Sequence, residues 1–283
     1  MHFADRLAQS VEEKQNSVLV GLDPRCDRLP SALAPADTDH ASVAEAYRLF
    51  CRGIVDVVAD LVPAVKPQAA FFEQLGPSGM AALHDVIHYA RERGLLVILD
   101  AKRGDIGSTA EAYAAAYLGS QSVWGADALT VNPYLGDDSL TPFVKRCQAT
   151  DCGIFVLVKT SNPGGKLFQD LETGDQQQTV FEHVADHVES IAQQTVGECG
   201  YGSIGAVVGA TYPAELTALR ERMPHTWFLI PGFGSQGGTA SDVAPGFDQR
   251  GLGAIINSSR AIIFAYDRPE YASVGSDNWQ AAV

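Results

Sequence analysis

The stretch LLVILDAKRGDIGSTA, residues 95–110, joins an apolar run to a group of opposed charges. The run LLVIL has the length and composition of a strand buried on both faces, as in a parallel sheet. The charged side chains that follow it are Asp100, Lys102, Arg103 and Asp105. Residues 108–119 then have apolar side chains at helical spacing. The stretch therefore predicts a strand, a charged loop and a helix, with the charges gathered where the strand ends.

The same unit recurs along the chain. Apolar runs rich in Val, Ile and Leu cover residues 17–23, 61–67, 95–102, 128–133, 153–160, 204–210, 227–234 and 253–260. Segments with helical apolar spacing lie between them, at residues 41–61, 79–94, 108–119, 178–194 and 214–223. This alternation predicts an α/β fold, and specifically a closed (β/α)8 TIM barrel.

The barrel is predicted to be a single domain covering residues 1–283, because chains of this length commonly form one such barrel. It carries an N-terminal helical extension and a polar, lid-like loop at residues 162–178. The main rival is a doubly wound open sheet. That fold commonly carries GxGxxG after its first strand, and no such motif follows residues 17–23 here.

Composition limits the possible partners. The formal net charge of −14 argues against general binding to nucleic acid or to anionic membranes. The five cysteines are an odd count without paired metal-ligand spacing, which favours reduced thiols in a cytoplasmic protein. The first 17 residues have no apolar core typical of a secretory signal, and no apolar run approaches membrane-spanning length.

Polar side chains gather at the ends of the predicted strands. They are Asp23, Lys66, Asp100, Lys102, Asn132, Thr160, Ser161 and Arg260. In a TIM barrel the carboxyl ends of the strands surround one mouth, where active sites lie. Ordinary polar loop residues would explain one or two of these positions but not the whole series.

Four charged side chains are expected to meet at this mouth. Residues two apart on a strand share a face, so Asp100 and Lys102 should point the same way, with Lys66 beside them and Asp105 just beyond. A lysine held between carboxylates stays charged, which makes it a poor Schiff-base nucleophile but a good proton donor. The group suits loss of a carboxylate as CO2 followed by protonation of a carbanion. A structural salt-bridge network and a charged surface loop are the alternatives.

Two later segments predict a phosphate site. IPGFGSQGG, residues 230–238, follows the seventh strand, and INSSRAI, residues 256–262, ends the eighth. The loops after these strands commonly bind phosphate in TIM barrels. Glycines allow backbone N–H groups to approach an anion, while Gln236 and Arg260 supply side-chain donors. A plain Gly-rich loop is the alternative.

Six motifs, taken together, resemble the orotidine 5′-phosphate decarboxylase family, and specifically its longer bacterial type. They are VGLDPR (20–25), AVKPQAAFFEQLG (64–76), LDAKRGDIGSTA (99–110), VKTSNPGG (158–165), PGFGSQGG (231–238) and SSRAI (258–262). The resemblance implies decarboxylation of orotidine 5′-phosphate to UMP in pyrimidine biosynthesis. It implies a homodimer with shared active sites.

The resemblance also implies roles for the charged residues. Lys102 is similar to the family's general acid, which protonates carbon 6 of the pyrimidine. Asp100 resembles the carboxylate that crowds the substrate carboxylate, and Lys66 the lysine that orders the group and contacts the ribose. Asp105 and Thr109 match the residues that each subunit donates in trans to the site of its partner.

The remaining carried-over residues are substrate contacts. Asp23 resembles a ribose-hydroxyl ligand and Ser161 a serine that reads the pyrimidine amide edge. Gln236 and Arg260 match the phosphate grips, with Gly234 and Ser259 as backbone neighbours, and Pro231 matches part of the wall.

The predicted enzyme needs no cofactor and no metal. The histidine pairs at 84/88 and 183/187 have metal-ligand spacing, but both fall on helices expected in the outer ring. Two alternatives stay open: a related barrel sugar-phosphate decarboxylase or aldolase, and a nucleotide-binding barrel without catalysis.

Overall fold

The computed structural model describes residues 1–174, 177–209, 213–231, 240–271, 273–274 and 276–283. Within them, eight parallel strands close into a barrel in the order β1-β10-β9-β8-β5-β4-β3-β2. The strands are β1 Val18–Leu22, β2 Ala64–Pro67, β3 Leu96–Arg103, β4 Ala128–Val131, β5 Gly153–Lys159, β8 Gly202–Val208, β9 Thr226–Ile230 and β10 Ala254–Ser258. All eight predicted strands are confirmed, and the closed barrel excludes the open sheet.

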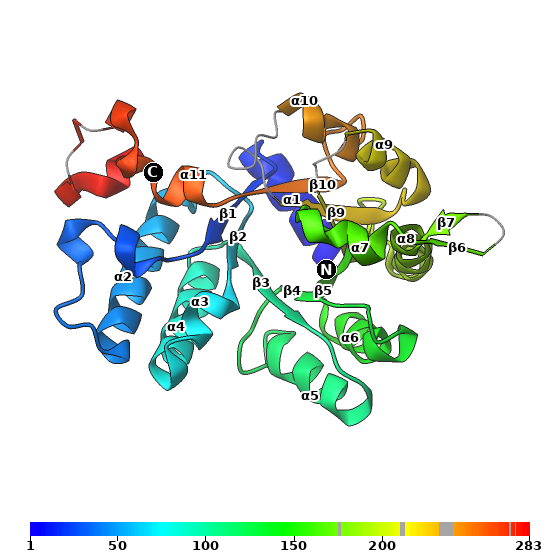
Figure 1. Ribbon diagram of the computed structural model, residues 1–283, viewed down its shortest axis with the longest axis horizontal. Coiled ribbons are helices and arrows are strands. Elements are labelled where there is room, and N and C mark those ends of the chain that lie inside the picture. The colour runs from blue at the N-terminus through cyan, green and yellow to red at the C-terminus, as the bar shows by residue number, and fades with distance from the viewer. Residues whose placement is uncertain (175–176, 210–212, 232–239, 272, 275) are drawn as a thin grey trace.

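Helices surround the barrel (Figure 1). They are α2 His40–Val58, α3 Ala69–Glu73, α4 Gly76–Glu92, α5 Gly107–Tyr117, α6 Asp137–Thr150, α8 Val180–Ala192, α9 Pro213–Arg222, α10 Ala240–Val243 and α11 Arg260–Ile263. Side-chain caps define two of the starts. Asp39 accepts hydrogen bonds from the Ala41 and Ser42 amides at α2, and Thr179 forms a capping box with Glu182 at α8.

The side chains of each strand alternate between two cores. On β5, Ile154, Val156 and Val158 face the helices, while Phe155 faces the barrel interior and Leu157 packs against the interior core. Period-two alternation of buried side chains is what a strand covered on both faces requires. Towards the carboxyl ends of the strands, the last residues of the inner core are Leu157, Val207 and Leu229. These residues also line the cavity described below.

The N-terminal extension is a plug for the opposite end of the barrel. Helix α1, Phe3–Lys14, buries Phe3, Leu7 and Val11 in the inner core. The Phe3 ring meets Phe155 edge-on, with centroids 6.1 Å apart. Gly153 makes room for Phe3, because a Cβ on this glycine would lie 2.2 Å from the Phe3 ring.

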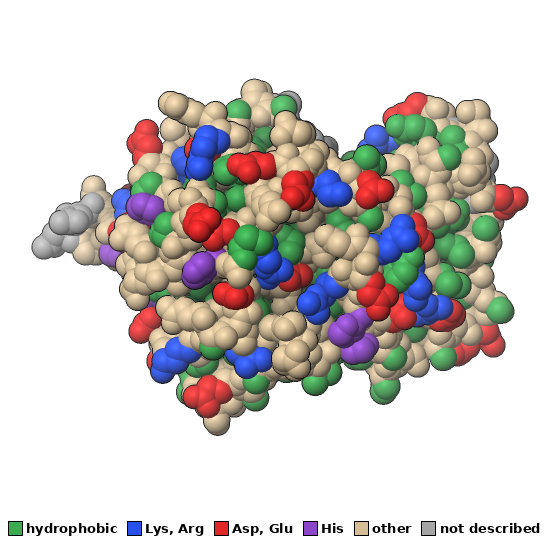
Figure 2. Space-filling model, turned by 180° about the vertical axis from the view of Figure 1, so that it is seen from behind, with side chains coloured by type: hydrophobic (Ala, Val, Ile, Leu, Met, Phe, Trp, Pro, Cys, Tyr) green, Lys and Arg blue, Asp and Glu red, His purple; other side chains and the backbone are tan. Residues whose placement is uncertain are grey.

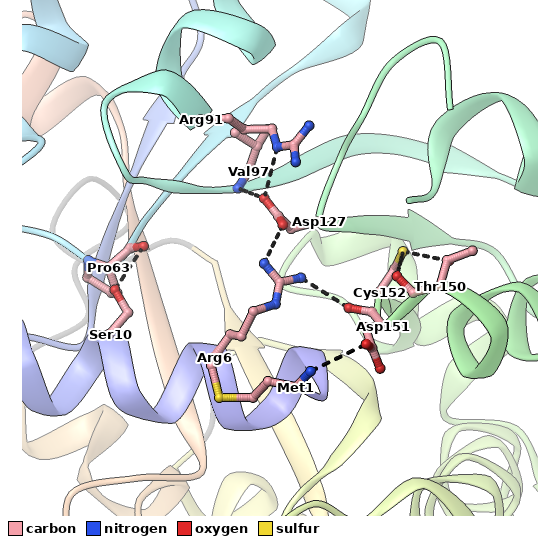
Figure 3. A network of polar contacts seen from close by, with 10 residues as sticks. All are labelled: Met1, Arg6, Ser10, Pro63, Arg91, Val97, Asp127, Thr150, Asp151 and Cys152. Atoms are coloured by element: carbon pink, nitrogen blue, oxygen red, sulfur yellow. Dashed lines mark hydrogen bonds and ion pairs between the residues drawn. The ribbon is translucent and has the colours of Figure 1, made fainter. Parts of the chain in front are cut away.

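Ion pairs fix this plug in place (Figure 3). Arg6 on α1 donates to the buried Asp127 carboxylate over 2.6 Å and to the Asp151 carbonyl over 3.0 Å. The same carboxylate accepts the Val97 amide over 2.9 Å. One buried aspartate therefore ties α1 to β3 and to the start of β4.

The lid-like loop has more structure than predicted. Its described part contains the short helix α7 Lys166–Gln169 and the hairpin strands β6 Glu172–Thr173 and β7 Gln178–Thr179. Figure 1 shows this hairpin projecting from the barrel beside α8. Closure over the mouth remains a prediction.

The molecular surface has mixed charges. The face in Figure 2 carries acidic and basic side chains interspersed rather than in one large block. None of the helices in the described residues is long and apolar enough to cross a membrane.

Candidate active site

A cavity of about 320 Å³ opens at the carboxyl ends of the barrel strands. Its lining residues are Asp23, Lys66, Gln68, Asp100, Lys102, Thr130, Leu157, Thr160, Ser161, Asn162, Val207, Leu229, Pro231, Asn257, Ser259 and Arg260. The floor is apolar, because it is the top of the inner core, while the walls are polar. Such a site can hold a polar ligand above a water-poor floor.

Asp100 lies at the centre of the charged wall. Its Oδ2 is 2.7 Å from Lys66 Nζ on β2, and its Oδ1 is 2.6 Å from Lys102 Nζ. Lys66 and Asp100 are only 4% and 7% exposed, whereas the Lys102 side chain is 46% exposed. One buried carboxylate thus bridges two ammonium groups, of which only Lys102 has a large exposed surface.

Two uncharged side chains complete the binding of this carboxylate. Gln68 Nε2 donates to Oδ2 over 3.1 Å, and Thr130 Oγ1 donates to Oδ1 over 3.0 Å. Burial alone would raise the pKa of Asp100, but Lys66 and Lys102 hold that pKa far below its usual value. Burial would lower the pKa of Lys66, yet Asp100 and Asp23 raise it. The buried Asp100 carboxylate and the buried Lys66 ammonium therefore keep each other charged at neutral pH.

Strand alternation alone does not place Lys102. The register of β3 against β4 shifts between Leu99 and Arg103, and Lys102 has a left-handed backbone with φ 48°. Few residues other than glycine adopt this conformation. Thr130 Oγ1 supports it by accepting the amides of both Ala101 (3.0 Å) and Lys102 (2.9 Å). The prediction that Lys102 joins Asp100 is correct, but a bulge rather than a regular strand achieves it.

The fourth expected member, Asp105, does not line this cavity. Its carboxylate accepts its neighbour's amide, Ile106 N, over 2.8 Å. Thr109 is exposed on the first turn of α5. Arg103 also points elsewhere, with its guanidinium bonded to Glu73 and to the Tyr117 hydroxyl. Of the four charged side chains expected to meet here, a single chain therefore brings together Lys66, Asp100 and Lys102 but not Asp105.

Comparison with known proteins identifies the family. The model of the family described as "Orotidine 5'-phosphate decarboxylase / HUMPS family" matches residues 18–273, which is most of the chain and includes the whole cavity. The chain belongs to this family.

Individual relatives agree with this membership. A Rhodopirellula baltica protein named orotidine 5′-phosphate decarboxylase is 54% identical and aligns over 100% of this chain and 95% of the relative. A relative of the same name from Caldicellulosiruptor bescii is 40% identical, over 94% and 90% of the two chains. The solved structure of Leishmania donovani OMP decarboxylase is 35% identical, covers 100% of both chains and superposes with a TM-score of 0.76.

Most of the sequence-predicted site residues lie together in this family member. Those lining the cavity are Asp23, Lys66, Asp100, Lys102, Ser161, Pro231, Ser259 and Arg260. Gly234 and Gln236 lie outside the described residues. Asp23 has a buried Oδ1 that accepts no hydrogen bond from the part of the chain described, so a bound hydroxyl could satisfy it.

Sequence reasoning missed several polar wall residues. They are Gln68, Thr130, Asn162 and Asn257. Thr130 was detectable as the one polar residue inside the apolar run ALTV, and Gln68 directly follows the strand that carries Lys66. Asn257 gave no comparable signal, because it precedes two serines that themselves look like loop residues.

Proposed function

We propose that this protein decarboxylates orotidine 5′-phosphate to UMP in pyrimidine biosynthesis. The observation that carries the proposal is the buried Asp100 carboxylate held between Lys66 and Lys102 on the wall of the cavity. Family membership and the names of the relatives support the same reaction.

Lys102 is the proton donor in this proposal. Its ammonium is half-exposed, whereas Lys66 is buried, so Lys102 is the cation available to a ligand. The bond between carbon 6 and the carboxyl group breaks, CO2 leaves, and the electron pair stays on carbon 6. The nearby ammonium stabilises the developing negative charge and then transfers its proton to that carbon. Solvent returns a proton to the neutral amine.

Asp100 has two functions in the same step. It holds the Lys102 ammonium in position through a 2.6 Å ion pair. It also places a fixed negative charge near the substrate carboxylate, and that repulsion falls as CO2 forms. The second effect depends on the carboxylate remaining ionised, which its lowered pKa supports.

The other cavity residues hold the substrate. Asp23 accepts a ribose hydroxyl beside Lys66, and Ser161 reads the pyrimidine amide edge. Arg260 binds the phosphate, with Ser259 and Pro231 in the adjoining wall; Ser259 is itself held by a 3.1 Å hydrogen bond to the Gly21 carbonyl. Gly234 and Gln236, outside the described residues, complete the phosphate site in this proposal.

The active protein is proposed to be a homodimer. Asp105 and Thr109 do not line the cavity of their own chain, and they are partly exposed and exposed, respectively, as residues donated in trans must be. Large apolar side chains nearby support a covered surface, since Ile106, Tyr134 and Leu135 are 53%, 83% and 51% exposed. A second subunit would bury them and add Asp105 to the charged wall.

The reaction is proposed to need no cofactor or metal and to occur in the cytoplasm. A fixed ammonium supplies both the charge and the proton, so the steps above require no further group. All five cysteines are free thiols, as is usual in a reducing compartment.

The direct test follows the absorbance of orotidine 5′-phosphate with EDTA present. We expect stoichiometric conversion to UMP and CO2 by the wild-type protein. Turnover that stops with EDTA and returns with a divalent cation would contradict the metal-free mechanism. Binding of UMP without any turnover would instead support the non-catalytic alternative. Inactivation by borohydride in the presence of a sugar phosphate would favour the aldolase.

A further inference from the structure

A second buried lysine lies behind the cavity wall. The side chain of Lys159, the last residue of β5, is 5% exposed and does not line the cavity. Its ammonium pairs with Asp170 and lies 3.5 Å from Glu215 Oε2. It also lies 4.3 Å from the centre of the Phe181 ring. A buried cation needs such partners, because an unpaired one is strongly disfavoured.

The partners of Lys159 come from three different elements. Asp170 directly follows α7 in the lid-like loop, Glu215 lies on α9, and Phe181 lies on α8. The Lys159 side chain thus links the end of β5 to the loop after it and to two outer helices.

The same loop makes a second attachment through the two neighbouring residues, Thr160 after Lys159 and Gln169 before Asp170. Gln169 Oε1 accepts the Thr160 amide over 3.0 Å, and Gln169 Nε2 donates to Thr160 Oγ1 over 2.7 Å. Gly209, which directly follows β8, also contacts residues 159–161. Its amide donates to the Lys159 carbonyl over 2.7 Å, and a Cβ there would lie 3.0 Å from Ser161 Cα. The backbone of residues 159–161 is therefore held between the loop and β8.

This attachment controls one wall of the active site. Thr160, Ser161 and Asn162 line the cavity directly after Lys159. In the barrel, β8 and β9 stand between β5 and β10, and Arg260 begins α11 just after β10. With the phosphate bound at Arg260, as proposed above, this wall would face the part of the ligand away from the phosphate.

We propose that Lys159 is a positioning residue that holds the Thr160–Asn162 wall against the base of the nucleotide by anchoring the loop through Asp170 and Glu215. The inference rests on the proposed function, because it assigns the base to this wall. Without the cation, the two carboxylates lose their common partner and the loop detaches for part of the time.

The test compares two ligands in Lys159→Met. UMP carries base, ribose and phosphate, whereas ribose 5-phosphate lacks the base. If the wall is in place only about a tenth of the time, the apparent Kd for UMP rises about tenfold. The Kd for ribose 5-phosphate should stay close to the wild-type value. Isothermal titration calorimetry with each ligand gives the ratio of the two Kd values. Hydrogen–deuterium exchange across residues 160–171 should become faster in the variant.

Three variants control for general damage. Arg6→Met removes a comparable ion pair at the plugged end of the barrel and should lower thermal stability without changing the ligand ratio. Lys159→Arg keeps the charge and should restore much of the UMP affinity. Asp170→Asn removes the loop side of the contact at a partly exposed position. This variant should weaken the binding of UMP but not that of ribose 5-phosphate. It provides the test of the proposal if Lys159→Met fails to fold.

Several results would overturn the inference. Equal loss of affinity for both ligands, or no loss for either, would make the cluster purely structural. If Arg6→Met changed the ratio of the two Kd values as much as Lys159→Met does, the Lys159 cluster would again be purely structural. These outcomes are distinct from failure of the proposed function, which would be seen as a wild-type protein that neither binds UMP nor turns over orotidine 5′-phosphate.

Discussion

At the scale of single residues, the active site depends on the charge state of Asp100. The carboxylate is almost fully buried and touches two ammonium groups, a glutamine and a threonine. Its pKa lies well below the usual value of 3.8, because the lysines outweigh the effect of burial. Its contribution to stability is therefore present above pH 3.8 and is lost as the pH falls towards the lowered pKa of the folded protein.

Asp100→Asn tests this electrostatic role. At pH 7 the free energy of unfolding should fall by about 3–5 kcal/mol, because Lys66 loses the carboxylate that compensates its burial. Below pH 4 the difference between wild type and variant should shrink, since the unfolded wild type then binds a proton that the folded protein does not. Urea unfolding at several pH values measures this. If the difference in the free energy of unfolding between the two proteins were the same at every pH, this electrostatic role of Asp100 would be contradicted.

Individual residues also mark the limit of sequence reasoning. The residue types Lys66, Asp100 and Lys102 were sufficient to predict the charged wall and its chemistry. The left-handed backbone of Lys102 was not predictable from the sequence, because it depends on Thr130 of the neighbouring strand. Asp105 was expected beside the others, yet it does not line the cavity of its own chain and accepts the Ile106 amide instead.

At the scale of elements, regular periodicity was the reliable signal. The eight strands and five of the outer helices, α2, α4, α5, α8 and α9, were predicted from apolar spacing. Helix α6 was missed because its sequence, DDSLTPFVKRCQAT, contains Pro142 and few apolar residues. Helix α7 and the hairpin were missed because elements of two to four residues carry no periodicity.

Helix α1 acquires a role that its sequence alone did not reveal. It closes the end of the barrel away from the active site and completes the inner core. Phe3→Ala should therefore destabilise the protein by about 3–5 kcal/mol, as for other fully buried aromatic side chains. Because the site is at the other end, kcat at a temperature below the transition should change little.

Thermal unfolding and steady-state kinetics on the same sample check this prediction. Glu13→Ala, on an exposed face of the same helix, is the matched control and should leave both quantities unchanged. A large loss of kcat in folded Phe3→Ala would show that the plug acts on the active site.

At the scale of the whole molecule, the two ends of the barrel have separate functions. One end is sealed by α1, and the other carries the cavity. The C-terminal segment adds support beside the mouth. Trp279, in the 3-10 helix Ser276–Ala282, is buried against Phe50 of α2, and Gln280 donates to the Gly53 carbonyl. This packing gives the tail a structural role that the sequence did not suggest.

The shared-site proposal also belongs to this scale. Lys102→Ala and Asp105→Ala proteins should each be inactive, but a mixture should regain activity. Random pairing gives hybrid dimers with one intact site each, so about a quarter of wild-type activity is expected. Subunit exchange must be verified by mass spectrometry. Exchange without recovered activity would contradict donation of Asp105 in trans.

The central claim is that the Lys102 ammonium stabilises and protonates the carbanion. The most direct measurement is kcat for orotidine 5′-phosphate in Lys102→Ala, alongside its thermal stability and its Kd for UMP. We predict a folded protein that still binds UMP but whose kcat falls by at least about 10³-fold, because proton donation and charge stabilisation are lost together. A folded Lys102→Ala protein with kcat near the wild-type value would contradict the account.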